Sequence, residues 1–116
     1  MSENIRVGII GAGGNTTLKH IPLLQKIDGV EIVSVANRSI KSSSEVASQF
    51  EIKNYYDNWL SAVDDNSLDA IVIGTWPYLH QRLTIEALEA GTHVLCEASM
   101  CMNADEAQEM LEVSQM

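Results

Sequence analysis

The sequence predicts an α/β fold, a doubly wound parallel sheet with helices on both of its faces. Short β-branched runs alternate along the chain with segments of helical periodicity. The runs are nearly unbroken instead of alternating apolar with polar residues, which is typical of strands covered on both faces. A glycine-rich turn joins the first run directly to the first helical segment. Strands and helices that alternate at this spacing imply parallel strands joined by right-handed crossovers.

Four apolar runs and one weaker segment are the predicted strands. The first run ends at Gly11, and the second precedes a polar stretch rich in serine. A weaker strand is expected at residues 53–55, between the second and third runs. The four runs are residues 5–10, 30–36, 69–74 and 93–97.

Five segments of helical periodicity fill the intervals and follow the last run. In the first, Ile27 is expected on the inner face, and Pro22 is expected to kink the helix because it removes a backbone donor. Gly91 stands where a left-handed C-cap belongs, and Asn103 with Glu106 gives a capping-box pattern. The predicted helices are residues 16–27, 41–50, 58–63, 78–90 and 103–113.

Composition and charge indicate one globular domain and exclude several function classes. The 116 residues are 46% apolar and 20% charged, and we expect them to form one domain over residues 1–116. Sixteen acidic against seven basic residues give a net charge of −9, which disfavours nucleic-acid and anionic-membrane partners. Cys96 and Cys101 make no disulfide framework, and no signal-peptide or membrane-span pattern is present. We therefore expect a cytoplasmic protein with reduced thiols and no metal site.

The turn Gly11-Ala12-Gly13-Gly14-Asn15-Thr16 carries the first functional signal. Gly11 and Gly13 match the first two glycines of G-x-G-x-x-G, and the small but branched Thr16 takes the third position. In that pattern the first glycine allows a tight turn and the second lets a pyrophosphate approach the backbone. The following helix start attracts phosphate, which explains how an acidic chain could hold an anion. The turn therefore predicts a dinucleotide site; the alternative is a structural turn in a protein that binds another ligand.

The end of the second predicted strand bears on the choice of cofactor. Dinucleotide sites usually place an acidic residue there to bind the ribose hydroxyls. Here the residues are Asn37 and Arg38, and no carboxylate is present. A guanidinium recognises phosphate through its planar fork, so this pair favours NADP over NAD. The alternative for Arg38 is a solvated loop cation.

Residues after the third and fourth runs complete a resemblance to a known family. The segments TWPYLH at 75–80 and ALEAGTHVLCE at 87–97, together with the glycine turn, His20 and Asn37-Arg38, resemble the N-terminal cofactor domain of the Gfo/Idh/MocA family. That family contains glucose-fructose oxidoreductase, inositol dehydrogenases and many sugar dehydrogenases. The resemblance covers nearly the whole chain and implies a Rossmann-like domain that binds NAD(P).

The resemblance also implies a set of cofactor-binding residues. The family's T-P-N-x-x-H motif, which lies along the cofactor near the nicotinamide, falls here on a partly matching segment. Its E-K-P motif falls on Glu97, Ala98 and Ser99, so the lysine is replaced by Ala98 and no catalytic residue can be assigned. The implied cofactor-binding residues are Gly11, Gly13, Gly14, Asn15, Asn37, Arg38, Thr75, Trp76, Pro77, His80 and Glu97.

In the family a sixth strand and a large substrate domain follow, and neither is contained in this chain. A truncated gene, a fragment or a stand-alone half would each give this sequence. The expected function is the NAD(P)-binding part of an oxidoreductase that transfers hydride to or from a sugar, polyol or related carbonyl compound. The chain alone is not expected to be catalytic. The alternative is a non-catalytic, dinucleotide-sensing or protein-binding module, which the absent lysine favours.

The expected partners are a small-molecule substrate in the full-length protein and a second copy of the chain. Without a sixth strand, residues 94–97 become a sheet edge, and exposed edges pair with other chains. Methionines gather in the tail, so uncovered apolar surface is expected there. Both features predict a homo-oligomer. The tail methionines are Met100, Met102, Met110 and Met116.

Overall fold

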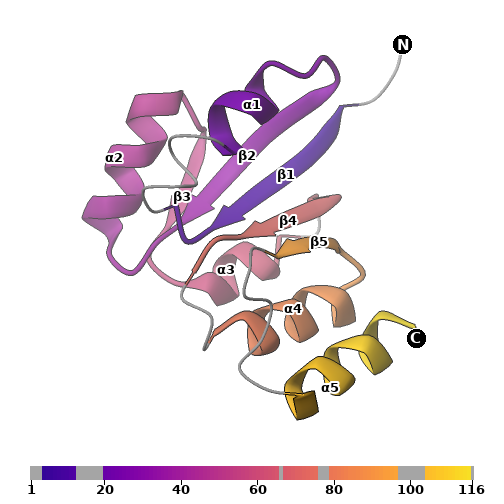
Figure 1. Ribbon diagram of the computed structural model, residues 1–116. Helices are drawn as coiled ribbons and strands as arrows, with labels where there is room; N and C mark the ends of the chain where they lie inside the picture. Colours follow the sequence, from indigo (N-terminus) through magenta and orange to yellow (C-terminus); the bar gives the residue numbers. More distant parts are fainter. Residues whose placement is uncertain (1–3, 13–19, 66, 76–78, 97–103, 116) are drawn as a thin grey trace.

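The computed structural model describes residues 4–12, 20–65, 67–75, 79–96 and 104–115 (Figure 1). Strands and helices alternate along these segments in the predicted order. The strands are β1 (Ile5–Ile10), β2 (Val30–Ala36), β3 (Asn54–Tyr56), β4 (Ala70–Ile73) and β5 (His93–Cys96). The helices are α1 (Ile21–Gln25), α2 (Ile40–Phe50), α3 (Trp59–Val63), α4 (His80–Glu89) and α5 (Ala104–Ser114).

The strands form one parallel sheet in the order β3-β2-β1-β4-β5. The chain therefore builds one half of the sheet outward from β1 and the other half outward from β4. This confirms the doubly wound parallel sheet. The register between β1 and β2 contains one irregularity: Val7 pairs with Ile32 and Gly8 with Ser34, so Val33 is skipped.

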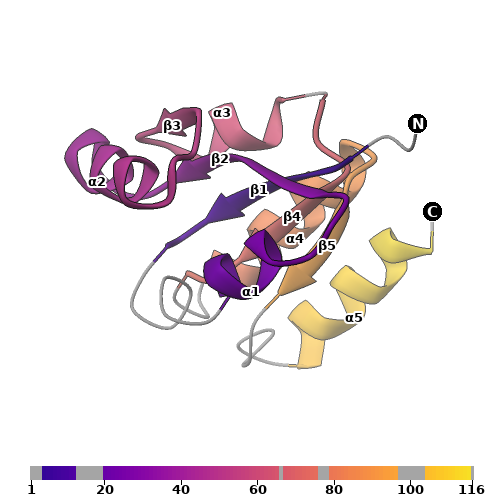
Figure 2. The ribbon, with the colours of Figure 1, turned by 90° about the horizontal axis from the view of Figure 1, so that it is seen from above.

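Helices cover both faces of the sheet, and each face has its own apolar core. Side chains of α1 and α2 pack on one face, and those of α3 and α4 pack on the other. Figure 2 shows α1 and α3 on opposite sides of the sheet. Ile9, Ile71 and Leu83 are fully buried, and burying each such side chain contributes about 1.5–3 kcal/mol. This two-sided burial explains the nearly unbroken apolar runs.

The strand predictions are confirmed with small shifts. The first two strands begin and end where the sequence predicts, whereas β3 begins one residue later. The strand β4 lies within the predicted segment 69–74, and β5 covers 93–96 of the predicted 93–97. Within the described sheet β5 is an edge strand, as expected, and its Leu95 is 56% exposed.

The first helix differs most from its prediction. It ends at Gln25, and Ile27, expected on the inner face, is exposed. Pro22 lies at the first positions of the described helix, where proline is well accommodated. The predicted kink at Pro22 involves the residues before His20 and stays a prediction. The predicted start at residues 16–19 lies outside the described residues.

Polar side chains cap the starts of α2 and α3, and left-handed residues follow the ends of α2 and α4. Ser39 accepts a hydrogen bond from the Ser42 N–H at the start of α2, and Asn58 does the same for Ser61 at α3. Gly91 has φ +83°, which confirms the left-handed residue predicted after α4. The end of α2 has no glycine there, and Glu51 adopts φ 56° instead.

The last helix packs along α4, and Gln81 donates a hydrogen bond to Glu109 across this contact (Figure 1). Met110 is buried, so the expectation that it adds to uncovered apolar surface is wrong. Met100, Met102, Met116 and the Asn103 cap lie outside the described residues. Among the described helices none combines the length and the apolar character that crossing a bilayer requires.

Candidate functional site

The described candidate residues gather where β1, β2 and β4 end. Since the three strands are parallel and adjacent, their carboxyl ends meet at one edge of the sheet. Gly11 follows β1, Asn37 follows β2, and Gly74 with Thr75 follows β4. The winding direction changes between β1 and β4, and the crevice at such a switch point is where open α/β sheets bind ligands. The predicted residues Gly11, Asn37 and Thr75 therefore share the expected location.

Gly11 makes a close approach that no other residue could make. Its φ is +83°, a left-handed value that side chains disfavour. A Cβ built on Gly11 would lie 2.6 Å from Thr75 Cγ2, 2.7 Å from Thr75 N and 2.9 Å from the Gly74 carbonyl carbon. Its N–H donates to the Ala36 carbonyl at 2.8 Å. The first glycine thus fixes the tight turn that the pattern predicts, pressed between the ends of β2 and β4.

Asn37 turns its side chain toward the glycine turn. Its Oδ1 accepts the Ala12 N–H at 2.6 Å, and its Nδ2 donates to the Ala12 carbonyl at 3.4 Å. Nδ2 also donates to Ser42 Oγ at 2.8 Å. The side chain of Asn37 therefore joins the residue after Gly11 to the first turn of α2.

A buried serine accepts a hydrogen bond from the backbone of Asn37. The Asn37 N–H donates to Ser43 Oγ at 2.8 Å, and Ser43 is fully buried. The Ser43 hydroxyl lies 3.1 Å from the Ser39 carbonyl and 2.5 Å from the Tyr56 carbonyl, so its single proton is shared between the start of α2 and the end of β3. This short network connects the ends of three elements at the candidate site.

The remaining described candidates border this network. Arg38 is exposed and comes directly after Asn37, so a guanidinium stands at the end of β2. Thr75 is half-buried against Gly11, and His80 is the first residue of α4. Gly13, Gly14, Asn15, Trp76, Pro77, Glu97 and the Ala98 position lie outside the described residues. Within the described part of the chain, no group of three or more His, Cys, Asp or Glu side chains could hold a metal.

Sequence reasoning missed the contributions of Ala12, Ser42 and Ser43. Two signals pointed to them. Short hydroxyl side chains near a helix start commonly bond to backbone groups, and residues 42–44 are three successive serines. An Asn at the end of a strand is likewise well suited to bonding a neighbouring backbone segment.

The family assignment agrees with this geometry. Residues 5–115 match the family described as "Oxidoreductase family, NAD-binding Rossmann fold", the Gfo/Idh/MocA family. The chain belongs to this family. Its members are oxidoreductases, and the described sheet is the family's NAD-binding Rossmann domain.

Individual relatives support the assignment over part of their length. An uncharacterized oxidoreductase of Rhizobium meliloti is 31% identical over 93% of this chain and 32% of its own. Levoglucosan dehydrogenase of Pseudarthrobacter phenanthrenivorans is 26% identical over 95% of this chain and 30% of its own. A 3-ketoreductase from Actinomadura kijaniata, solved in complex with NADP, has a TM-score of 0.91 at 23% identity, covering 97% of this chain and 36% of its own. The chain spans about a third of the length of the curated relatives it matches.

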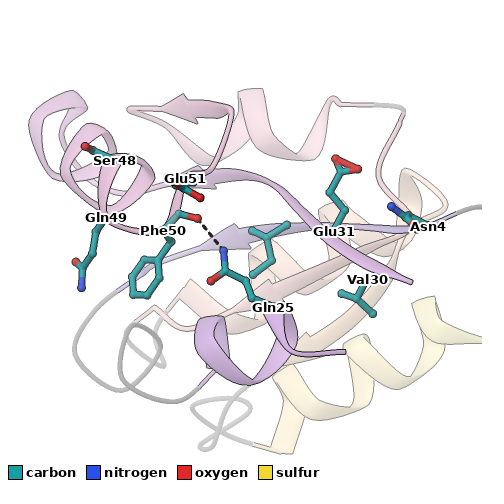
Figure 3. A pocket seen from close by; sticks show the side chains of 9 residues that line it. Asn4, Gln25, Val30, Glu31, Ser48, Gln49, Phe50 and Glu51 are labelled. Carbon is teal, nitrogen blue, oxygen red and sulfur yellow. Dashed lines mark hydrogen bonds between the residues drawn. The ribbon is translucent and has the colours of Figure 1, made fainter. Parts of the chain in front are cut away.

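A hollow lies at the other end of the sheet and is no part of this site. It has a volume of about 570 Å³ and lies between the ends of α1 and α2, beside the start of β2 (Figure 3). Gln25 donates to the Phe50 carbonyl at 2.8 Å along its wall. Val30 and Glu31, at the amino end of β2, also line it. Ligands of doubly wound sheets bind at the opposite, carboxyl end.

Proposed function

We propose that the protein is an oxidoreductase that transfers hydride between a nicotinamide cofactor and a sugar, polyol or related carbonyl compound, and that residues 1–116 form its NAD(P)-binding domain. The observation that carries the proposal is the left-handed Gly11 turn packed against Thr75 at the switch point of the sheet. Relatives such as levoglucosan dehydrogenase support the substrate class.

The glycine turn would hold the pyrophosphate. Backbone N–H groups of Gly13, Gly14 and Asn15 would supply donors for phosphate oxygens, as the glycine pattern predicts. Thr75, Trp76, Pro77 and His80 would lie along the nicotinamide half, and Glu97 after β5 would face the same region. The cofactor supplies the hydride, while the chain binds and orients it. With Ala98 at the position of the family lysine, no residue of this chain is assigned a proton-transfer role.

NADP is the proposed cofactor, and NAD is the alternative. No carboxylate follows β2 to repel a 2′-phosphate, and the exposed Arg38 offers a guanidinium at the same place. The solved neighbours include a ketoreductase complex with NADP and a levoglucosan dehydrogenase complex with NADH. Both cofactors therefore occur on this fold, and Arg38 supports the first.

Calorimetric titration of the folded chain with NADPH and then NADH tests the proposal, with circular dichroism as the check on folding. We expect both to bind and NADPH to bind more tightly. Tighter binding of NADH would refute the cofactor choice. No binding by a well-folded chain would refute cofactor binding by residues 1–116 alone. Added to NADPH and common sugars, the chain alone is expected to give no oxidation above background.

Ala98 favours a second candidate function, a non-catalytic module that senses dinucleotides or binds another protein. Alanine can donate neither a proton nor a hydrogen bond from its side chain, so the residue at the position of the family lysine cannot take part in proton transfer. A carbonyl-reductase assay of the whole protein separates the two functions. Turnover would reject the sensing module, whereas cofactor binding without turnover of any tested sugar would support it.

We also propose that the chain self-associates through β5. Within the described sheet β5 is an edge strand, and its Leu95 is 56% exposed. Exposed edges offer unpaired backbone groups to a second copy. Light scattering is expected to show a dimer, and a clean monomer at high concentration would contradict this.

A further inference from the structure

We propose that Asn37 is a positioning residue that holds Ala12, the second residue of the glycine turn, in place and does not read the ribose of the cofactor. From the sequence alone, Asn37 and Arg38 are predicted to act as one recognition pair. The hydrogen bonds separate the two, since one side chain turns into the fold and the other is exposed. The inference depends on the proposed function only where it concerns the cofactor.

Both N–H donors of the Asn37 amide are occupied within the fold. An asparagine side chain carries two such donors and one carbonyl oxygen. Nδ2 donates to Ser42 Oγ at 2.8 Å and to the Ala12 carbonyl at 3.4 Å, and Oδ1 accepts the Ala12 N–H at 2.6 Å. A donor bond to a ribose or phosphate oxygen would therefore require breaking one of these bonds.

The same bonds pair the backbone N–H and carbonyl of Ala12, which lies beyond the end of β1. Ala12 follows β1 and is 6% exposed, so its peptide groups need partners inside the protein. The Asn37 amide supplies both, as the backbone of a neighbouring strand would. The segment between Gly11 and Gly13 is thereby fixed before any ligand arrives, which lowers the ordering cost of binding.

The position of Asn37 is itself fixed by buried groups. Its N–H is bound by Ser43 Oγ, which is fully buried and shares its single proton between the carbonyls of Ser39 and Tyr56. The next residue, Arg38, is exposed and lies in the bend that leads into α2. With Asn37 facing inward, the exposed Arg38 is left to discriminate NADPH from NADH.

Amide hydrogen exchange of the full 116-residue chain tests the inference without cofactor. Asn37→Ala is expected to speed exchange of the Ala12 N–H roughly fivefold or more, because this N–H loses its acceptor. The amides of Ile9 and Val35 serve as the internal reference. Asn37→Asp keeps an acceptor oxygen and is expected to leave this N–H protected. Ser39→Ala is the matched control, since it removes the cap on Ser42 in the same region without touching Ala12.

Cofactor titration supplies the second readout. Asn37→Ala is expected to weaken the binding of NADPH and of NADH by the same factor, because the lost hydrogen bond lies outside the ribose contact. The ratio of the two Kd values should therefore stay within about twofold of its value in the unmodified chain. Arg38→Ala is expected to change that ratio. Unchanged exchange of the Ala12 N–H in Asn37→Ala, or a changed Kd ratio, would overturn the inference. If the unmodified chain binds neither cofactor, the proposed function fails for this chain, and the exchange experiment still decides the role of Asn37.

Discussion

Replacing Gly11 with alanine measures how strongly the glycine turn is constrained by the end of β4. Two costs add at this position. Holding an L side chain at φ +83° costs about 1–2 kcal/mol. The added Cβ would also lie 2.6 Å and 2.7 Å from Thr75 Cγ2 and N, and relieving such overpacking costs about 1–3 kcal/mol. We therefore expect Gly11→Ala to lower the free energy of unfolding by roughly 2–5 kcal/mol.

The chain offers a matched control for this substitution. Gly29 has φ +87°, but a Cβ there would meet nothing within 4 Å, so Gly29→Ala carries the conformational cost alone. Urea unfolding followed by circular dichroism gives both free energies, and unchanged m-values would show that the comparison is sound. If Gly11→Ala cost no more than Gly29→Ala, the packing of the turn against Thr75 would not constrain it, and the reasoning would be refuted.

Three further substitutions have defined outcomes. Arg38→Ala is expected to raise the Kd for NADPH roughly tenfold or more and leave that for NADH nearly unchanged, because a charged hydrogen bond to the 2′-phosphate is lost; calorimetry measures both. Glu51→Gly is expected to raise the free energy of unfolding by about 0.5–1 kcal/mol, since it relieves the left-handed strain at φ 56° after α2; thermal unfolding measures this. Ser34→Ala is expected to be neutral or stabilising by up to about 1 kcal/mol in urea unfolding, because the buried Ser34 hydroxyl has no hydrogen-bond partner among the described residues.

Each has an outcome that would contradict it. If Arg38→Ala weakened the binding of both cofactors equally, this side chain would not discriminate between them. A loss of stability in Glu51→Gly would mean that the glutamate side chain contributes more than its strained backbone costs. Marked destabilisation by Ser34→Ala would show that the hydroxyl has a partner or fills space that alanine leaves empty.

The sequence predicts the fold well because the decisive signals are local. The runs that became β1 and β2 are buried on both faces, so their composition alone marks their bounds. Gly91 and the first glycine of the turn were recognisable for a similar reason, since a left-handed backbone is a requirement of a single position. These features do not depend on which distant segment packs against them.

Features that depend on pairing between distant segments were not predictable in this way. Asn37 and Ala12 are 25 residues apart, and their hydrogen bonds exist only because β1 and β2 end side by side. Nothing in the local sequence separates an Asn that binds ribose from one that binds a backbone. The exposure of Ile27 likewise follows from where α1 ends, which helical periodicity alone does not fix.

The skipped residue in β2 has a consequence for how this chain tolerates changes in length. Because side chains of a strand alternate between faces, a one-residue slip reverses every later side chain. Val33 has no partner in β1, and the residues after it are paired one position further along than those before it. Deleting Val33 would give a continuous ladder in which Ser34, Val35 and Ala36 keep their present partners in β1, so Asn37 and Arg38 would keep their orientations. The sheet can therefore absorb a one-residue deletion at this point, and its damage would fall on the core that Val33 helps to fill and not on the ligand end of the strand.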